Sequence, residues 1–91
     1  MLNADTLLKS VEGYVFSITL SWTGATAGDK VYLVDDTQDS SADPSKHLVV
    51  FVLDAANGTY AREWTQGKKF TRGLFYKEGT AANVFTEITY K

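Results

Sequence analysis

Large apolar side chains alternate with small, mostly hydroxylated ones along residues 14–22, the most regular stretch of the chain. The large members are Tyr14, Phe16, Ile18, Leu20 and Trp22. A period of two is typical of an antiparallel strand that turns one face to the core and the other to solvent. This stretch is therefore predicted to be a half-buried strand with its large side chains on the buried face.

Five further stretches have the length and pattern of strands. They are residues 30–36, 47–53, 59–64, 70–77 and 83–90. Glycines and the single proline separate them at intervals typical of turns, and residues 4–11 fit a short helical turn or a first strand equally well. The sequence thus predicts an all-β fold, namely an antiparallel β-sandwich or small barrel of six to seven strands.

Residues 47–53, HLVVFVL, form an unbroken apolar run rich in β-branched side chains. Such a run is typical of a strand that is covered on both faces. We therefore expect it at the centre of a sheet or at a contact between subunits. The turn that follows contains Asn57 and Gly58, and Gly58 is expected to adopt a positive φ angle.

Ninety-one residues suffice for one small domain, so residues 1–91 are predicted to form a single β domain. Residues 1–12 are expected to be an N-terminal arm or an edge strand. The absence of cysteine excludes disulfides, thiolate metal sites and cysteine nucleophiles. The sequence shows no signal peptide and no apolar stretch of about 18 residues, so no membrane partner is expected.

Charge is unevenly distributed along a chain whose formal net charge is -2. Residues 1–45 carry two bases and seven acids, whereas residues 46–91 carry seven bases and four acids. The acidic balance disfavours a general binder of nucleic acid. The asymmetry indicates head-to-tail association or docking on a charged partner, or else two sets of ordinary solvated loops.

The polar segment of residues 35–46 is predicted to be a long loop. Its carboxylates are Asp35, Asp36, Asp39 and Asp43. A calcium-binding EF-hand needs Gly and Glu where this loop has Ser40 and Lys46, so a solvated loop is favoured over an irregular cation site. His47, the only histidine, has neither the ligand spacing of a zinc site nor a recognisable catalytic triad, and we predict no metal.

The segment TGATAGD, residues 23–29, lacks the Gly-Lys-Ser/Thr ending of a phosphate-binding loop. Gly24 and Gly28 are expected to supply unusual backbone angles between two strands. No pair of carboxylates has the pattern of a glycosidase. We therefore predict no catalytic residues, no cofactor and no enzymatic activity.

Residues 62–77 interleave cations with aromatic side chains. Three interpretations apply: core aromatics with solvated bases, a protein interface, or a single-stranded nucleic-acid platform. The candidate contact residues are Trp64, Lys68, Lys69, Arg72, Phe75 and Tyr76.

Three stretches together resemble a known group of proteins. They are WTGATAGDKVYL (residues 22–33), ANGTY (residues 56–60) and FTRGLFYKEGTAANVFTEITY (residues 70–90). Their order and spacing resemble short, all-β virion proteins of tailed bacteriophages, over roughly residues 14 to 90. The matching positions are turn and strand residues, so the resemblance transfers no catalytic site.

The resemblance implies a non-enzymatic virion structural protein, above all a capsid decoration (cement) protein that stabilises the assembled shell. A tail or head-fibre accessory protein is the alternative within this group. The implied partners are the major capsid protein or other virion proteins and further copies of the chain, with a trimer favoured. The implied location is the virion, assembled in the cytoplasm of the bacterial host. Judged from the residues alone, a further alternative stays open, namely a small β module that binds single-stranded nucleic acid or glycans.

Overall fold

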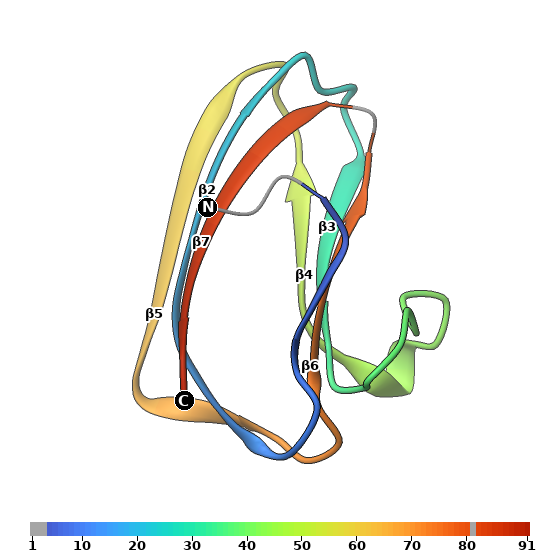
Figure 1. The fold of residues 1–91 in the computed structure, drawn as a ribbon. Helices are drawn as coiled ribbons and strands as arrows, with labels where there is room; N and C mark the ends of the chain where they lie inside the picture. The colour runs from blue at the N-terminus through green and yellow to red at the C-terminus, as the bar shows by residue number, and fades with distance from the viewer. Residues whose placement is uncertain (1–3, 81) are drawn as a thin grey trace.

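The computed structural model describes residues 4–80 and 82–91, which form two antiparallel sheets packed face to face (Figure 1). The predicted all-β sandwich is confirmed. Its strands are β1 (Thr6–Lys9), β2 (Gly13–Thr23), β3 (Asp29–Val34), β4 (His47–Leu53), β5 (Gly58–Phe70), β6 (Leu74–Gly79) and β7 (Asn83–Tyr90), with a single 3-10 turn, η1 (Pro44–Lys46), before β4.

The strand order is β1-β6-β3-β4 in one sheet and β5-β2-β7 in the other. Alternate residues of both sheets point inward, as the period of two requires, and meet in one apolar core. The most buried large members are Tyr76, Phe70, Ile18, Leu20, Leu33, Leu53 and Leu74. The sandwich is thus built around β2, which pairs with both of its neighbours along nearly its whole length.

A β-bulge at Phe16 changes which residues of β2 face the core. Val15 pairs with Tyr90 and Ser17 with Thr89, so Phe16 is an extra residue between two consecutive pairs. Val15 is buried in consequence, whereas Tyr14 is 42% exposed. The prediction that Tyr14 and Phe16 share the buried face of Ile18 is therefore wrong, because alternation does not continue across the bulge.

The strand predicted for residues 70–77 is shifted in the structure. β5 continues to Phe70, residues 71–73 form a turn, and β6 begins at Leu74. The Asp35 carboxylate fixes this turn by accepting the backbone N–H groups of Thr71 at 3.0 Å and Arg72 at 2.7 Å. At the N-terminus, Thr6–Lys9 form an edge strand against β6, and Met1–Asn3 lie outside the described residues.

β4 lies at the edge of its sheet, paired only with β3. Val49, Phe51 and Leu53 are buried, but Val50 and Val52 on the opposite face are exposed. The central position predicted for residues 47–53 is therefore wrong within one chain. A contact between subunits, the other expectation, stays a prediction.

Gly58 is required for the close approach of Trp22. A Cβ atom at position 58 would lie 2.7 Å from the indole Cζ2. The indole Nε1 donates a hydrogen bond to the Ala55 carbonyl at 3.1 Å, which holds the ring across the β4–β5 turn. The positive φ predicted at Asn57-Gly58 is wrong, since Gly24, Gly28 and Gly67 are the positive-φ residues of the described chain.

Candidate functional site

The structure separates the six contact residues predicted between residues 62 and 77. Tyr76 is fully buried, so its side chain offers no surface to a partner. Phe75 is half-buried on the outer face of β6, beside Leu7. Trp64 is half-buried on β5 and lies beneath the Arg62 guanidinium, which is 5.2 Å from the ring centroid. These three aromatic residues therefore form no common surface.

Lys68, Lys69 and Arg72 lie at one end of the sandwich. Strand pairing brings Gly13 opposite Phe70, and Lys9 opposite Leu74, so the β1–β2 connection lies against the end of β5 and the start of β6. Figure 1 shows these segments gathered with the C-terminal end of β7. We call this surface the basic end and define it by its cations, Lys9, Lys68, Lys69, Arg72 and Lys91.

A hollow of about 570 Å³ opens at the basic end. Its walls include the side chains of Tyr14 and Phe16, whose ring centroids are 6.4 Å apart. Gly67, with a φ of 81°, lets both rings pack closely over β5, because a Cβ there would lie 3.0 Å from Tyr14 and Phe16 atoms. The remaining lining residues are Lys9, Glu12, Gly13, Gln66, Lys69 and Lys91.

The cations of the basic end are available for an outside partner. Among the described residues, Lys46 and Lys77 are the only cationic side chains that form ion pairs, and neither belongs to the basic end. Asp35, the nearby carboxylate, is already engaged by the 71–73 turn. Burial raises its pKa, but the N–H donors of the turn outweigh this effect and hold the pKa below its ordinary value. Asp35 is therefore ionised at neutral pH, and Glu12 also lines the hollow, but the five cations outnumber these two carboxylates and leave the basic end positive.

The other aspartates of the 35–46 loop cap turns instead of converging on a cation. Asp36 accepts hydrogen bonds from Ser40 and Lys46, and lies almost completely out of solvent. Asp39 accepts from Ser41, and Asp43 from Ser45. Hydrogen bonds from these serine hydroxyls are the largest causes that lower the pKa values of the three carboxyls. Over the residues described, no three ligating side chains are grouped to hold a metal ion.

His47 has a structural position. Its Nε2 lies 2.6 Å from the Ser41 carbonyl, and its ring packs against Tyr32 with centroids 5.2 Å apart. In the other predicted loop, Gly24 and Gly28 adopt φ angles of 74° and 94°, as expected from their spacing. Asp29 holds that loop by accepting the Thr26 N–H and the Thr80 hydroxyl.

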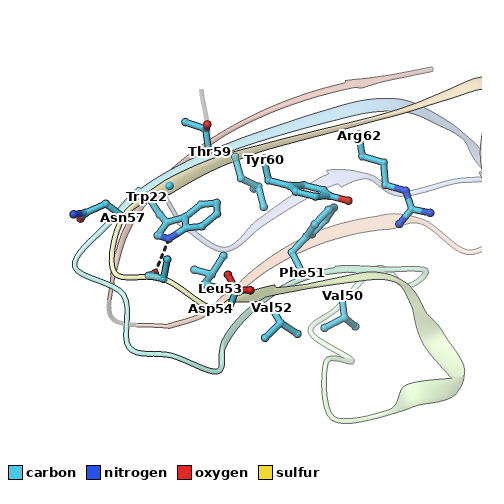
Figure 2. A pocket seen from close by; sticks show the side chains of 13 residues that line it. Trp22, Val50, Phe51, Val52, Leu53, Asp54, Asn57, Thr59, Tyr60 and Arg62 are labelled. Carbon is cyan, nitrogen blue, oxygen red and sulfur yellow. Dashed lines mark hydrogen bonds between the residues drawn. The ribbon is translucent and has the colours of Figure 1, made fainter.

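A second hollow, of about 440 Å³, lies between β4 and β5 on the side where both sheets end (Figure 2). The Phe51 and Tyr60 rings meet edge to face there, with centroids 5.4 Å apart. Trp22 and Arg62 mark its two ends in Figure 2. We call it the edge groove. Its lining combines apolar side chains of β2, β4 and β5 with the polar residues Asp54, Asn57 and Thr59.

One polar contact crosses the core between the sheets. The Tyr76 hydroxyl on β6 lies 2.6 Å from the Thr86 hydroxyl on β7, and also donates to Glu78 at 3.1 Å. Burial is the main cause that raises the pKa of Tyr76 and of Glu78 above their ordinary values. The contact satisfies two buried hydroxyls and links the two layers.

Sequence reasoning missed Tyr14, Phe16, Lys9 and Lys91 as members of the basic end. Lys9 and Lys91 come from opposite ends of the chain and meet only through strand pairing. The bulge that turns Tyr14 outward has one visible signal, Gly67 on the neighbouring strand. The edge groove was missed because an unbroken apolar run predicts a strand covered on both faces, at the centre of a sheet or at a subunit contact, and not one that borders a hollow.

Comparisons with protein families, curated proteins and solved structures found no match. The described part of the chain contains no helix with the length and apolar character of a membrane span.

Proposed function

We propose that the chain is a non-enzymatic structural protein of a bacteriophage particle, a decoration protein that docks on the assembled shell through its basic end. The observation that carries the proposal is the gathering of Lys9, Lys69 and Lys91 around the hollow beside Tyr14 and Phe16. Aromatic side chains are typical anchors of protein interfaces. The resemblance of residues 14–90 to small virion proteins supplies the biological setting.

Docking through this end suits a decoration role for a physical reason. A positive surface is attracted to acidic patches of a protein lattice, and electrostatic complementarity sets the orientation of docking. A protein that binds the assembled shell and not the free subunit adds its binding free energy to the assembled state. The shell would then resist heat better with the protein bound.

The test uses particles of the phage that encodes the chain, prepared without its gene. Purified protein should sediment with these particles and raise their disruption temperature. The variant Lys68→Glu/Lys69→Glu/Arg72→Glu should lose at least about tenfold in affinity, because each reversed charge removes an attraction and adds a repulsion. Circular dichroism establishes that the variant is folded.

Lys30→Glu is the matched control, since Lys30 is an exposed lysine of β3 that pairs near Gly79, away from the basic end. It should bind as the unaltered protein does. Failure of the unaltered protein to sediment with the particles would overturn the proposal. Equal binding by the triple variant and the control would overturn the role of the basic end.

A second candidate, binding of single-stranded nucleic acid, is favoured by one observation. The Tyr14 and Phe16 rings lie beside three lysines, and base stacking on aromatic side chains contributes about 1–3 kcal/mol per base. This function predicts affinity for an unstructured oligonucleotide that falls steeply with salt. A labelled oligonucleotide that shows no change in anisotropy at low salt would exclude it.

A further inference from the structure

β4 is an edge strand, and its residues 49–53 have none of the features that normally protect such edges. Soluble proteins blunt exposed edges with charged side chains, proline, bulges or very short strands. Residues 47–53 include no Lys, Arg, Asp, Glu or Pro. Pairing with β3 is irregular at Leu48, between the pairs Leu33–Val49 and Val34–His47, and is unbroken from Leu33–Val49 to Asp29–Leu53. Residues 49–53 therefore present a straight apolar edge of the kind that pairs with another strand.

The other edge strand beside the edge groove differs in this respect. β5 carries Arg62, Glu63, Lys68 and Lys69, and its pairing with β2 is interrupted opposite Phe16. Charges and irregular pairing are the usual means of preventing strand addition. The unprotected character is thus particular to β4 on this side of the sandwich.

The outer face of β4 is also apolar. Val50 is 37% exposed and Val52 is 55% exposed, whereas the half-buried Leu48 packs against the core. β-Branched and aliphatic side chains facing each other across an antiparallel pair stabilise a sheet. A strand added to β4 would therefore bury these side chains as well as satisfy free backbone groups.

The charges that flank β4 indicate what the added strand is. Lys46 precedes the strand and Asp54 follows it. An antiparallel pair of two β4 strands places each lysine beside an aspartate of the other copy, whereas a parallel pair would align like charges. The Lys46 side chain is bonded to Asp36 at 3.0 Å but keeps 27% of its surface exposed, so it can also face a second carboxylate.

Two-fold symmetry limits the register of such a pair. Residues directly opposite in an antiparallel pair lie on the same face of the sheet, so a two-fold axis must pass through a residue position. An axis at Val50 sets Val50 against Val50 across the interface. It also brings Lys46, which lies in η1 just before the irregularity at Leu48, toward Asp54 of the second copy.

We propose that two copies of the chain pair through β4, antiparallel and centred on Val50, which joins their four-stranded sheets into one continuous sheet. The proposal does not rest on the proposed function, since it involves neither the basic end nor the particle. A two-fold interface of this kind is self-complementary and closes at two copies. It therefore also differs from the trimer that the resemblance implies.

The first test is the mass of the protein in solution, measured by light scattering over about a hundredfold range of concentration. The unaltered chain should be a dimer that dissociates on dilution. Val50→Lys places two ammonium groups opposite each other at the axis and should weaken the dimer at least about tenfold. Val11→Lys is the matched control, because Val11 is an exposed valine outside the strands, and it should leave the dimer intact.

The second test fixes the register by cross-linking, which is unambiguous because the chain has no native cysteine. Opposite Cα atoms in an antiparallel pair lie about 4.5–5.5 Å apart, within the span of a disulfide. Val50→Cys should therefore form a covalent dimer on mild oxidation. Val52→Cys should not, because a shift of four residues separates its two copies by about 13 Å.

Several results would overturn the proposal. A chain that is monomeric at every concentration does not pair with a second copy. The β4 edge would then be a site for a strand of another protein. A stable trimer would exclude the two-fold pair. So would a dimer that Val50→Lys leaves unchanged, or cross-linking of Val52→Cys as fast as that of Val50→Cys.

Discussion

The Asp36 carboxylate shows how this protein uses an aspartate-rich loop. The Ser40 hydroxyl, the Lys46 ammonium and the Thr37 N–H all donate to it, and these donors lower its pKa from 3.8 to about 2. The Ser40 hydroxyl is the largest of these causes. An ionised carboxylate with this many donors is a structural anchor, and it joins the start of the loop to its end at η1.

We predict that Ser40→Ala makes the unfolding free energy depend less on pH in the acid range. The folded pKa of Asp36 lies below its ordinary value, so ionised Asp36 stabilises the fold fully above pH of about 4, and this contribution is lost as pH falls toward about 2. Ser40→Ala removes the main cause of the low pKa. The variant should therefore unfold at a lower urea concentration than the unaltered protein at neutral pH.

Urea unfolding at a series of pH values measures this effect. The difference in unfolding free energy between the unaltered protein and Ser40→Ala should shrink as the pH approaches about 2. Ser41→Ala, which removes a hydroxyl bonded to the exposed Asp39, is the comparison and should cost less. A difference that stays constant with pH would contradict the link to Asp36.

At the scale of strands, the alternation of apolar and polar residues predicted the positions of the strands well. It predicted less well which side chains face the core. The bounds of β4 and β7 match the predicted residues 47–53 and 83–90, and both have a continuous pattern. β5 and β6 were misplaced because the polar residues 65–69 were not recognised as a continuation of a strand. The bulge at Phe16 and the edge position of β4 depend on pairing partners, which a local pattern does not specify.

The contact between Tyr76 and Thr86 leads to a prediction about how the sheets are joined. Tyr76→Phe leaves the buried Thr86 hydroxyl without its partner, which should cost about 1–3 kcal/mol of unfolding free energy. Replacing both hydroxyls by apolar groups removes the need for this hydrogen bond, and Glu78 loses the Tyr76 donor equally in the single variant Tyr76→Phe and in the double variant. The double variant Tyr76→Phe/Thr86→Val should therefore lose less unfolding free energy than the sum of the losses in the two single variants.

Denaturant unfolding of the four proteins completes this double-mutant cycle. A coupling energy of about 1 kcal/mol is expected, as for groups in direct contact. Additive effects would show that the two hydroxyls do not depend on each other, although they lie 2.6 Å apart. Thr89→Val, at an exposed position of β7, serves as the reference for the same substitution without a buried contact.

For the molecule as a whole, the basic end was predicted only in part. Lys68, Lys69 and Arg72 follow from a local run of charge, whereas Lys9 and Lys91 join them through the pairing of distant strands. In the acidic half of the chain, most aspartates serve as hydrogen-bond acceptors within loops. Charge counted along the sequence therefore underestimates how positive this end is.

Pairing of two molecules should be visible in thermal unfolding. A domain of this size buries only about 60–65% of its unfolded surface, so an added interface contributes a large share of its stability. If β4 pairs as proposed, the midpoint temperature should rise by roughly 5 °C for each hundredfold increase in concentration. Differential scanning calorimetry measures this dependence, and Val50→Lys should abolish it. A midpoint independent of concentration in the unaltered protein would contradict the expectation.

The bulge at Phe16 has a consequence for how the chain can change in length during evolution. In a regular strand, loss of one residue turns every side chain on one side of the deletion to the opposite face. Phe16 is supernumerary in the pairing of β2 with β7, so its loss would leave Val15 inward and Ser17 outward. Relatives with a β2 one residue shorter could keep the same core, and an alignment without a gap at this position would superimpose inward residues on outward ones.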